Sequence, residues 1–369
     1  MKQGWEIKKL GEVCEVIGGS TPKTNEESYW GGEHFWISPA ELDGSKYVYS
    51  TSRTITDEGV RSAHLQMLPI GTVLLSSRAP IGKVAITKVP MYCNQGFKNL
   101  ICKNEVINEY VYWFLSHSTN YLNSLGTGAT FKEISKKVVE QVSIPVPPLP
   151  EQEKIVAELD CLSGIIEKKK QQLKELDALA QSIFYEMFGD PVTNEKGWEV
   201  KKLGEVASDI FAGGDKPKDI SDVQTEEYAY PVYANGDGEK GLLGYSRKYR
   251  VASKAVTIGA RGASIGNCRI CNERFTPVVR LITIVPGEDL DIIFLYHSAL
   301  KMEFDINGAG QAQLTIPNVV SKCIILPPLP LQQTFASKIE AIEKQKELIK
   351  QSINEVETLF NSRMQEYFG

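Results

Sequence analysis

The chain lacks any long apolar run. No stretch of about 18 consecutive apolar residues occurs, so we expect no membrane-spanning helix. The opening residues MKQGWEIKKL contain no apolar segment like that of a secretory signal, so we expect a cytoplasmic protein. Seven cysteines, an odd number without the spacing of a disulfide framework, agree with a reducing compartment.

Motifs of catalysis are also missing. There is no G-x-x-x-x-G-K-[ST] loop, no N-P-P-[YF] segment and no glycine-rich cofactor loop with an acidic partner. The triplets at 6–8 and 199–201 resemble the end of a metal-nuclease signature, but metal catalysis needs several convergent carboxylates and no suitable aspartate is repeated upstream. Cys268 and Cys271 form one C-x-x-C, whereas zinc needs four ligands, so we expect core cysteines. We therefore predict no catalytic residue, no metal site and no cofactor bound by this chain.

Neither charge sign is strongly in excess. The formal net charge is -5, with 42% hydrophobic and 24% charged residues, which is ordinary for a globular protein. This balance argues weakly against a free-standing nucleic-acid binder, although a local basic face counts more than the sum. At 369 residues the chain is long enough for two to three domains.

The sequence does contain a tandem repeat of itself. The stretch GWEIKKLGEV begins at Gly4, and GWEVKKLGEV begins 193 residues later at Gly197. Three later pairs, PVPPLP and LPPLP, FLSHS and FLYHS, MFG and YFG, each lie 180 residues apart. The repeat therefore covers the whole chain, with a net deletion inside the first part of the second copy. Trp5 and Trp198 are expected to anchor the chain beside a helix end, and for the first copy the second long helix would supply that end.

The first part of each copy has the pattern of a mixed α+β domain. Apolar runs typical of strands lie at 71–77, 83–87, 255–260 and 278–285, separated by Gly, Pro and Asn. Helical stretches near 107–123 and 289–304 interrupt them. We expect globular parts at about 1–150 and 190–330.

The second part of each copy predicts a long helix, at 151–189 and 331–369. Apolar residues recur at alternating steps of four and three, with Lys169 and Lys346 as the polar interruptions. The positions are Ile155, Leu159, Leu162, Ile166, Leu173, Leu176, Ala180, Ile183 and Met187, then Phe335, Ile339, Ile342, Ile349, Ile353, Val356 and Phe360. About 38 helical residues extend for roughly 57 Å.

Two matching apolar stripes in one chain predict that the long helices pack on each other. Because the first helix leaves the first globular part and the second begins at the end of the second, we expect an antiparallel pair. The predicted fold is therefore α+β, with two globular parts, two long antiparallel coiled-coil helices between them and a pseudo-twofold repeat. The alternative is one extended helix packed locally in each domain.

The same residues resemble a known family, the specificity subunit of Type I restriction-modification systems. The resemblance is carried by GWEIKKLGEVCEVIGGSTPKT, by LSSRAPIGKVAI with CNQGFKNL, and by GTGATFKEISKKVVEQVSIPVPPLPEQEKIV. In the second copy it is carried by YPVYANGDGEKGLLGYS, TIGARGASIGN and INGAGQAQLTIPNVVSKCIILPPLP. Together these stretches extend over essentially the whole chain.

The resemblance implies a function without catalysis by this chain. Such a subunit carries two target recognition domains, each reading one half of a bipartite, asymmetric site in double-stranded DNA. It docks two methyltransferase subunits, which use S-adenosylmethionine to methylate adenine, and restriction subunits are a further possible partner. A rod of the length above suits half-sites about one helical turn, roughly 34–36 Å, apart. A coiled-coil scaffold that binds only protein is the alternative.

Residues that read DNA should be Arg, Lys, Asn, Gln or hydroxyl groups on loops. Arg78 in SSRAPIG and Arg261 in GARGASIG follow a strand at like places and are the leading candidates; the alternative is that they bond loop carbonyls. Further DNA-binding candidates are Lys23, Ser77, Lys83, Asn94, Gln95 and Lys98 in the first copy, and Lys216, Tyr233, Asn235, Arg247, Lys254, Asn267 and Gln311 in the second.

Candidate partner-binding residues lie where the family carries an E-Q pair after its proline-rich segment. Here they are Glu151 and Gln152 in the first copy and Gln332 in the second. Leu331 replaces the glutamate of the second copy, so a role shared by both copies is in doubt for Glu151, which also suits a first helical turn.

Overall fold

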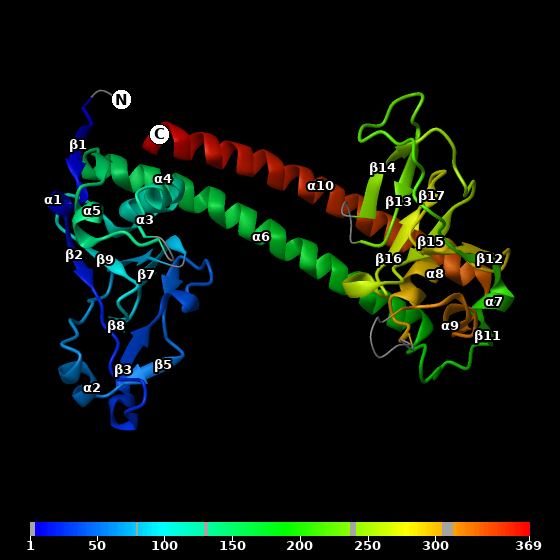
Figure 1. Cartoon of the computed structure of the whole chain (residues 1–369), viewed down its shortest axis with the longest axis horizontal. Coiled ribbons are helices and arrows are strands. Elements are labelled where there is room, and N and C mark those ends of the chain that lie inside the picture. Colours follow the sequence, from blue (N-terminus) through cyan, green and yellow to red (C-terminus); the bar gives the residue numbers. More distant parts are fainter. Residues whose placement is uncertain (1–3, 79, 129–131, 237–240, 305–312) are drawn as a thin grey trace. The chain divides into compact units, whose positions relative to one another are not determined.

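The structure, a computed structural model, describes residues 4–78, 80–128, 132–236, 241–304 and 313–369. The chain divides into two compact units, Met1–Lys170 with Gln351–Gly369, and Gln171–Lys350. Each long helix therefore contributes to both units (Figure 1). Among the described residues, no helix is both long and apolar enough to cross a membrane.

The first unit contains three sheets. A five-stranded sheet has the order β2-β9-β6-β7-β4, a three-stranded sheet the order β5-β3-β8, and β1 pairs with β10. The strands are β1 (Glu6–Lys9), β2 (Cys14–Gly18), β3 (Trp30–Ile37), β4 (Tyr47–Val48), β5 (Arg53–Ile55), β6 (Val73–Ser77), β7 (Ile81–Thr87), β8 (Tyr92–Cys93), β9 (Lys98–Cys102) and β10 (Ser143–Val146).

The second unit repeats this plan. A four-stranded sheet has the order β12-β18-β15-β16, a three-stranded sheet the order β14-β13-β17, and β11 pairs with β19. The strands are β11 (Val200–Lys202), β12 (Ala207–Ala212), β13 (Tyr230–Tyr233), β14 (Leu242–Ser246), β15 (Ala255–Ile258), β16 (Cys268–Cys271), β17 (Thr276–Pro277), β18 (Ile282–Pro286) and β19 (Cys323–Ile325).

The helices follow the same repeat. In chain order they are α1 (Leu10–Val13), α2 (Asp57–Ser62), α3 (Asn108–His117), α4 (Thr119–Ser124), α5 (Lys136–Glu140), α6 (Leu149–Phe188), α7 (Leu203–Val206), α8 (Ile292–Ala299), α9 (Ile316–Val320) and α10 (Leu329–Phe368). Short 3-10 turns lie at Glu27–Tyr29, Pro39–Glu41 and Gly262–Ser264. Helices α1, α3, α5 and α6 of the first copy match α7, α8, α9 and α10 of the second.

The strand orders confirm the internal repeat. Strands β2, β9, β6 and β7 occur in the same order as β12, β18, β15 and β16. The two parallel pairs also match, because β3 pairs with β8 through Ile37 and Cys93, as β13 pairs with β17 through Tyr233 and Pro277. Between β3 and β6 the first copy carries β4, β5 and α2, whereas the described residues between β13 and β15 of the second copy form the single strand β14. The net deletion predicted from the sequence lies mainly in this segment.

In the first unit, the start of α6 packs against the end of α10. Glu158 pairs with Arg363 at 2.9 Å and Lys170 with Glu357 at 3.0 Å, so the residue numbers run in opposite directions and the helices are antiparallel. Ile155 is only 1% exposed, and burying such an aliphatic side chain contributes about 1.5–3 kcal/mol. The predicted antiparallel pairing is confirmed here, and local packing of a single helix is wrong.

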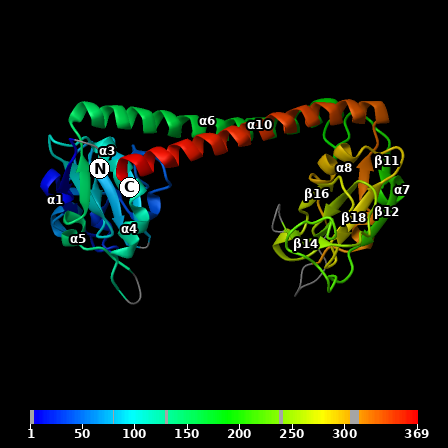
Figure 2. The same ribbon diagram turned by 90° about the horizontal axis from the view of Figure 1, so that it is seen from above.

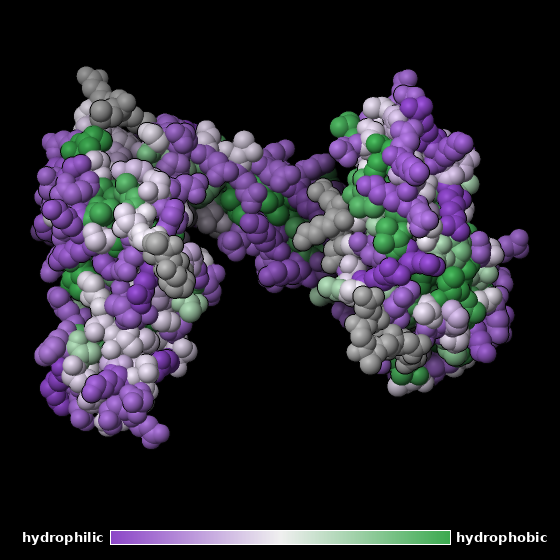
Figure 3. Space-filling model, in the orientation of Figure 1, coloured by the Kyte–Doolittle hydropathy of each residue, from purple (hydrophilic) through white to green (hydrophobic). Residues whose placement is uncertain are grey.

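The same pairing holds in the second unit. Asp177 of α6 lies 2.8 Å from Lys346 of α10, and the rings of Phe184 and Phe335 are 5.6 Å apart. Both helices are continuous in Figures 1 and 2. On the face shown in Figure 3, hydrophilic residues border hydrophobic ones along these helices. The seam residues Ile166, Ile342 and Ile353 are buried, at 8%, 6% and 7% exposure, so each helix covers part of the apolar face of the other.

Each unit has its own apolar core that includes a helix end. In the first unit, Met364 and Tyr367 of α10 join the cluster around α3, and Trp5 packs against it. In the second, Phe188 of α6 occupies the equivalent place, and Trp198 Nε1 donates to the Phe188 carbonyl at 2.9 Å. The expectation that α10 supplies the missing helix end of the first copy is confirmed.

One predicted strand begins later than expected. Residues 278–285 read as a continuous β run, but β18 begins at Ile282. The preceding residues form a turn in which Val279 and Arg280 have φ angles of 52° and 64°. The other apolar runs correspond to β6, β7 and β15, with ends that differ by a few residues.

Candidate nucleic-acid interface

Arg78 and Arg261 occupy the same place in the two copies. Arg78 directly follows β6, and Arg261 follows β15, the matching strand. Each makes an isolated antiparallel bridge through its backbone, Arg78 to Glu133 and Arg261 to Gln313. The bridge holds each arginine against the segment that follows the glycine-rich block of its copy. Arg78 is half-buried and Arg261 is exposed.

A short turn lies beside each arginine. In the first unit it is 94–97, and Ser77 donates its backbone N–H to the Gly96 carbonyl at 2.7 Å. In the second unit the turn is 278–281, placed equivalently because the flanking strands β8 and β9 match β17 and β18. A Cβ at Gly19 would lie 2.1 Å from the Cys93 carbonyl oxygen, and one at Gly213 would lie 2.6 Å from the Val278 nitrogen. Only glycine permits this close approach of β2 and β12 to the two turns.

The turn of the second unit is strained. Val279 and Arg280 both lie in the left-handed region, which is a genuine outlier for a β-branched residue and costs about 1–3 kcal/mol per residue. Hydrogen bonds hold it: Val279 donates its N–H to the Gly214 carbonyl at 2.8 Å, and Arg280 donates to the Gly213 carbonyl at 3.2 Å. Arg280 was not predicted as a site residue, because VVRL reads as part of a strand.

Several first-copy candidates are engaged inside the protein. Ser77 is fully buried, so its prediction as a DNA contact is wrong for the side chain. Lys98 pairs with Glu133 at 3.3 Å, and Lys83 Nζ donates to the Leu42 carbonyl at 2.7 Å. Asn94 Oδ1 accepts the Gly96 N–H at 2.8 Å. These groups build the turn and the strand end beside Arg78.

The remaining first-copy candidates lie at the surface. Gln95 is exposed and bonds to the hydroxyl of Thr21. Lys23 is exposed in the loop before β3, and its carbonyl accepts the indole N–H of Trp30 at 3.1 Å. Gln95 therefore lies in the turn beside Arg78, whereas Lys23 belongs to a different loop.

The second-copy candidates also divide into residues that bond within the protein and residues at its surface. The amide of Asn235 is used within the fold, because its Nδ2 donates to the Val279 carbonyl at 2.6 Å and its Oδ1 accepts the Ala260 N–H at 2.7 Å. Arg247 is exposed but pairs with Asp219 at 3.1 Å and Glu227 at 2.9 Å.

Tyr233 stacks under the guanidinium of Arg269, and the remaining second-copy candidates are described by one backbone bond or by their exposure. The guanidinium of Arg269 is 4.5 Å from the centre of the Tyr233 ring, and burial raises the pKa of this phenol to about 12. Asn267 accepts the Gly259 N–H through its backbone carbonyl at 2.8 Å. Lys216 and Lys254 are exposed. Gln311 lies outside the described residues.

The glutamines predicted to bind a partner are buried instead. Gln152 Oε1 accepts the Ile107 N–H at 3.1 Å, and its Nε2 donates to the carbonyls of Glu105 and Pro147 at 2.9 and 2.8 Å. Gln332 repeats the three bonds with Asp291, Asp289 and Pro327 at 2.9, 3.0 and 2.8 Å. Both side chains are 0% exposed, so direct contact with a partner is wrong for them. They tie each long helix to the start of α3 or α8.

Glu151 differs from its neighbour. It is half-buried in the first turn of α6 and lies 3.8 Å from Lys154. Its carboxylate is 39% exposed, so contact of Glu151 with a partner stays a prediction, while Leu331 at the matching position packs partly into the second core.

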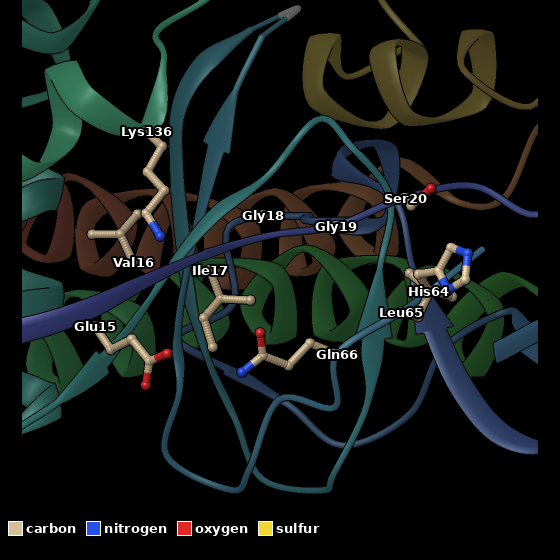
Figure 4. Close-up of a pocket in the computed structure, with 10 residues that line it drawn as sticks. All are labelled: Glu15, Val16, Ile17, Gly18, Gly19, Ser20, His64, Leu65, Gln66 and Lys136. Carbon is tan, nitrogen blue, oxygen red and sulfur yellow. The ribbon is translucent and has the colours of Figure 1, made fainter. Parts of the chain in front are cut away.

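A small hollow of about 200 Å³ lies elsewhere in the first unit. It is lined by β2, by the loop around His64 and by Lys136 at the start of α5 (Figure 4). Figure 4 shows Glu15, Gln66 and Lys136 around Ile17. It contains none of the predicted DNA-binding residues, and its opposite charges do not single out a DNA contact.

The loops that carry Arg78 and Arg261 present guanidinium groups on a backbone that the repeat positions in the same way in both units. Proteins that bind nucleic acids use such groups to contact phosphates and base edges. Within the described residues, no group of His, Cys, Asp or Glu could hold a metal ion. A fold that repeats one arginine-bearing loop in each unit is an arrangement suited to recognising nucleic acid.

Comparison with known proteins identifies the family. The model of the Type I restriction modification DNA specificity domain matches residues 2–178 and 195–358. The chain belongs to this family, and it is a non-catalytic DNA-recognition subunit.

Relatives and solved structures agree with the family. The specificity subunit of the MjaIX Type I restriction enzyme of Methanocaldococcus jannaschii is 33% identical in an alignment of 375 positions, and the alignment covers 92% of this chain and 86% of that protein. The EcoprrI specificity subunit of Escherichia coli is 22% identical over 353 residues, covering 90% and 86%. The S subunit from M. genitalium shares the fold, with a TM-score of 0.66 at 14% identity, covering 100% of this chain and 98% of that one.

Proposed function

We propose that each unit reads one half of a bipartite site in double-stranded DNA, through the loops that carry Arg78 and Arg261. The observation that carries the proposal is the equivalent placement of these two arginines at matching strand ends. In the described parts of the chain neither guanidinium has an ion pair, so each keeps its donors for a ligand. Because the residues around the two arginines differ, the two half-sites should differ and the target should be asymmetric.

The globular parts 1–150 and 190–330 would act as target recognition domains, and the helices at 151–189 and 331–369 would set the gap between half-sites. Two methyltransferase subunits, carrying S-adenosylmethionine for adenine methylation, would bind the helix pair and its proline-rich entries, where Glu151 is the open candidate. Restriction subunits would join the same complex. A complex that methylates the DNA of the cell works where that DNA lies, so this role would be cytoplasmic.

The test assembles the chain with its partner methyltransferase and selects from a random DNA library. We expect enrichment of one gapped, asymmetric sequence. Arg78→Ala and Arg261→Ala should each relax one half-site only, by about 1–3 kcal/mol if the contact is bidentate to guanine. Arg61→Ala, at an exposed arginine of α2, serves as the control. Partner binding without sequence enrichment would instead favour the protein-binding scaffold.

A further inference from the structure

Most arginines of the second globular part already have a partner within the protein. Arg247 pairs with two carboxylates, Asp219 and Glu227. Three others lie over aromatic rings: Arg250 over Phe211 at 4.5 Å, Arg269 over Tyr233 at 4.5 Å and Arg274 over Tyr249 at 4.9 Å. Arg261 and Arg280 are different, because both are exposed and, as far as residues 171–236, 241–304 and 313–350 are concerned, neither has an ion pair or a ring partner.

One side chain holds the backbone next to both of these arginines. The amide of Asn235 accepts from the N–H of Ala260, which precedes Arg261, and donates to the carbonyl of Val279, which precedes Arg280. The strand end after β15 and the turn between β17 and β18 are thereby fixed to each other. The two free guanidinium groups are therefore carried by neighbouring, mutually fastened backbone segments.

The first copy has no counterpart to Arg280. Pro277 pairs with Tyr233 as Cys93 pairs with Ile37, and β18 begins five residues after Pro277 as β9 begins five residues after Cys93. Arg280 thus corresponds to Gly96. Gly96 does not have a left-handed φ, whereas Arg280 has a φ of 64°, a conformation that glycine adopts without strain and a long side chain does not. A strained residue that the fold itself would tolerate better as glycine points to a function for its side chain.

We propose that Arg280 is a specificity-determining residue of the second recognition part, whose guanidinium contacts a base edge beside the contact made by Arg261. The proposal rests on the proposed DNA-reading function and extends it to a residue that only one copy possesses. Arginine presents a rigid fork of donors that matches guanine in the major groove, so guanine is the expected base. The contact would help to make the second half-site different from the first.

The decisive variant is Arg280→Gly in the full chain, assembled with its methyltransferase partner. Because glycine relieves the left-handed strain, the melting temperature should stay the same or rise. Binding to the selected DNA should nevertheless weaken roughly 10- to 100-fold, with base preference lost at one or two positions of the second half-site only. Val279→Gly is the matched control: it relieves the same kind of strain one residue away and should leave DNA selection unchanged.

Arg280→Lys separates a base contact from a phosphate contact. Lysine keeps the charge but lacks the fork, so base preference should be lost while most non-specific affinity remains. Equal weakening on all sequences in Arg280→Gly would indicate phosphate contact and overturn the proposal, as would unchanged selection. If the wild-type complex enriches a gapped sequence, the proposed function stands whatever Arg280 does; if it enriches none, the proposed function and this extension both fail.

Discussion

Replacing Gln152 by alanine should destabilise the first unit by about 3–5 kcal/mol. This value is the cost of three lost hydrogen bonds and a cavity, reduced by the water that reaches some of the freed backbone groups. Its amide satisfies the N–H of Ile107 and the carbonyls of Glu105 and Pro147. The side chain is 0% exposed, so solvent does not reach these groups without movement of the backbone. Each buried backbone group left without a partner costs about 1–3 kcal/mol, and the lost side chain leaves a cavity.

Gln152→Glu sharpens the test because it preserves shape. A carboxylate would still accept the Ile107 N–H but would face the carbonyl oxygens of Glu105 and Pro147 with no donor. We therefore expect it to destabilise the unit at least as much as Gln152→Ala at pH 7. Part of the loss should be recovered in mild acid, since a protonated carboxyl can donate to one carbonyl.

The second copy provides an internal replicate. Gln332 makes the same three bonds, so Gln332→Ala should cost the second unit a similar amount. Hydrogen exchange resolved by peptide would show which unit loosens, and thermal unfolding would give the size of the effect. Glu153→Ala and Gln333→Ala, at the exposed neighbours, are the controls. If either buried variant unfolds like the wild type, the three hydrogen bonds of that glutamine do not stabilise its unit and the reasoning is refuted.

Two further predictions concern helix ends and pH. Phe368 packs against Tyr110 and Phe114 with ring centres 5.3 and 5.9 Å apart, so Phe368→Ala should destabilise the first unit by about 2–4 kcal/mol and leave hydrogen exchange of the second unit unchanged. Burial, aided by Lys301 and Lys346, lowers the pKa of His297 to about 4, so the unfolded chain takes up this proton more readily and stability falls as the pH drops below about 6.5. Between pH 7 and 5 this group should cost at most about 2 kcal/mol, and a thermal melt of His297→Gln with the same pH dependence as wild type would contradict that.

The long helices were largely predictable because the 3.5-residue pattern is sustained. The pattern placed Ile155 and Leu159 in the seam, and both are buried. Near the end of α6 it placed Ile183 and Met187 there, whereas Phe184 and Phe188 are the residues at 0% exposure. A straight helix of 3.6 residues per turn drifts by about 20° per heptad against a strict heptad pattern. After several heptads the buried face has therefore moved by one residue, toward the core of the second unit.

The candidate site was only partly predictable. Repetition at matching strand ends was enough to select Arg78 and Arg261. Arg280 was missed because its neighbours are β-branched and apolar, and such composition predicts a strand. A left-handed turn forms instead, because the carbonyls of Gly213 and Gly214 accept from the turn and the Asn235 amide donates to it. The local sequence does not indicate hydrogen bonds to residues so far away in the chain.

Residues that are identical in the two copies serve the fold, although a shared motif first suggests a shared binding function. Gln152 and Gln332 are identical because both amides complete buried backbone bonds, while Glu151 and Leu331 differ because the first helical turn tolerates either residue. Trp198 likewise donates to the last turn of α6. Agreement between the copies thus marks the scaffold that fixes two equivalent loops. Where the copies disagree within those loops, as at Gly96 and Arg280, the scaffold imposes no common residue, and that is where a difference between two half-sites can be encoded.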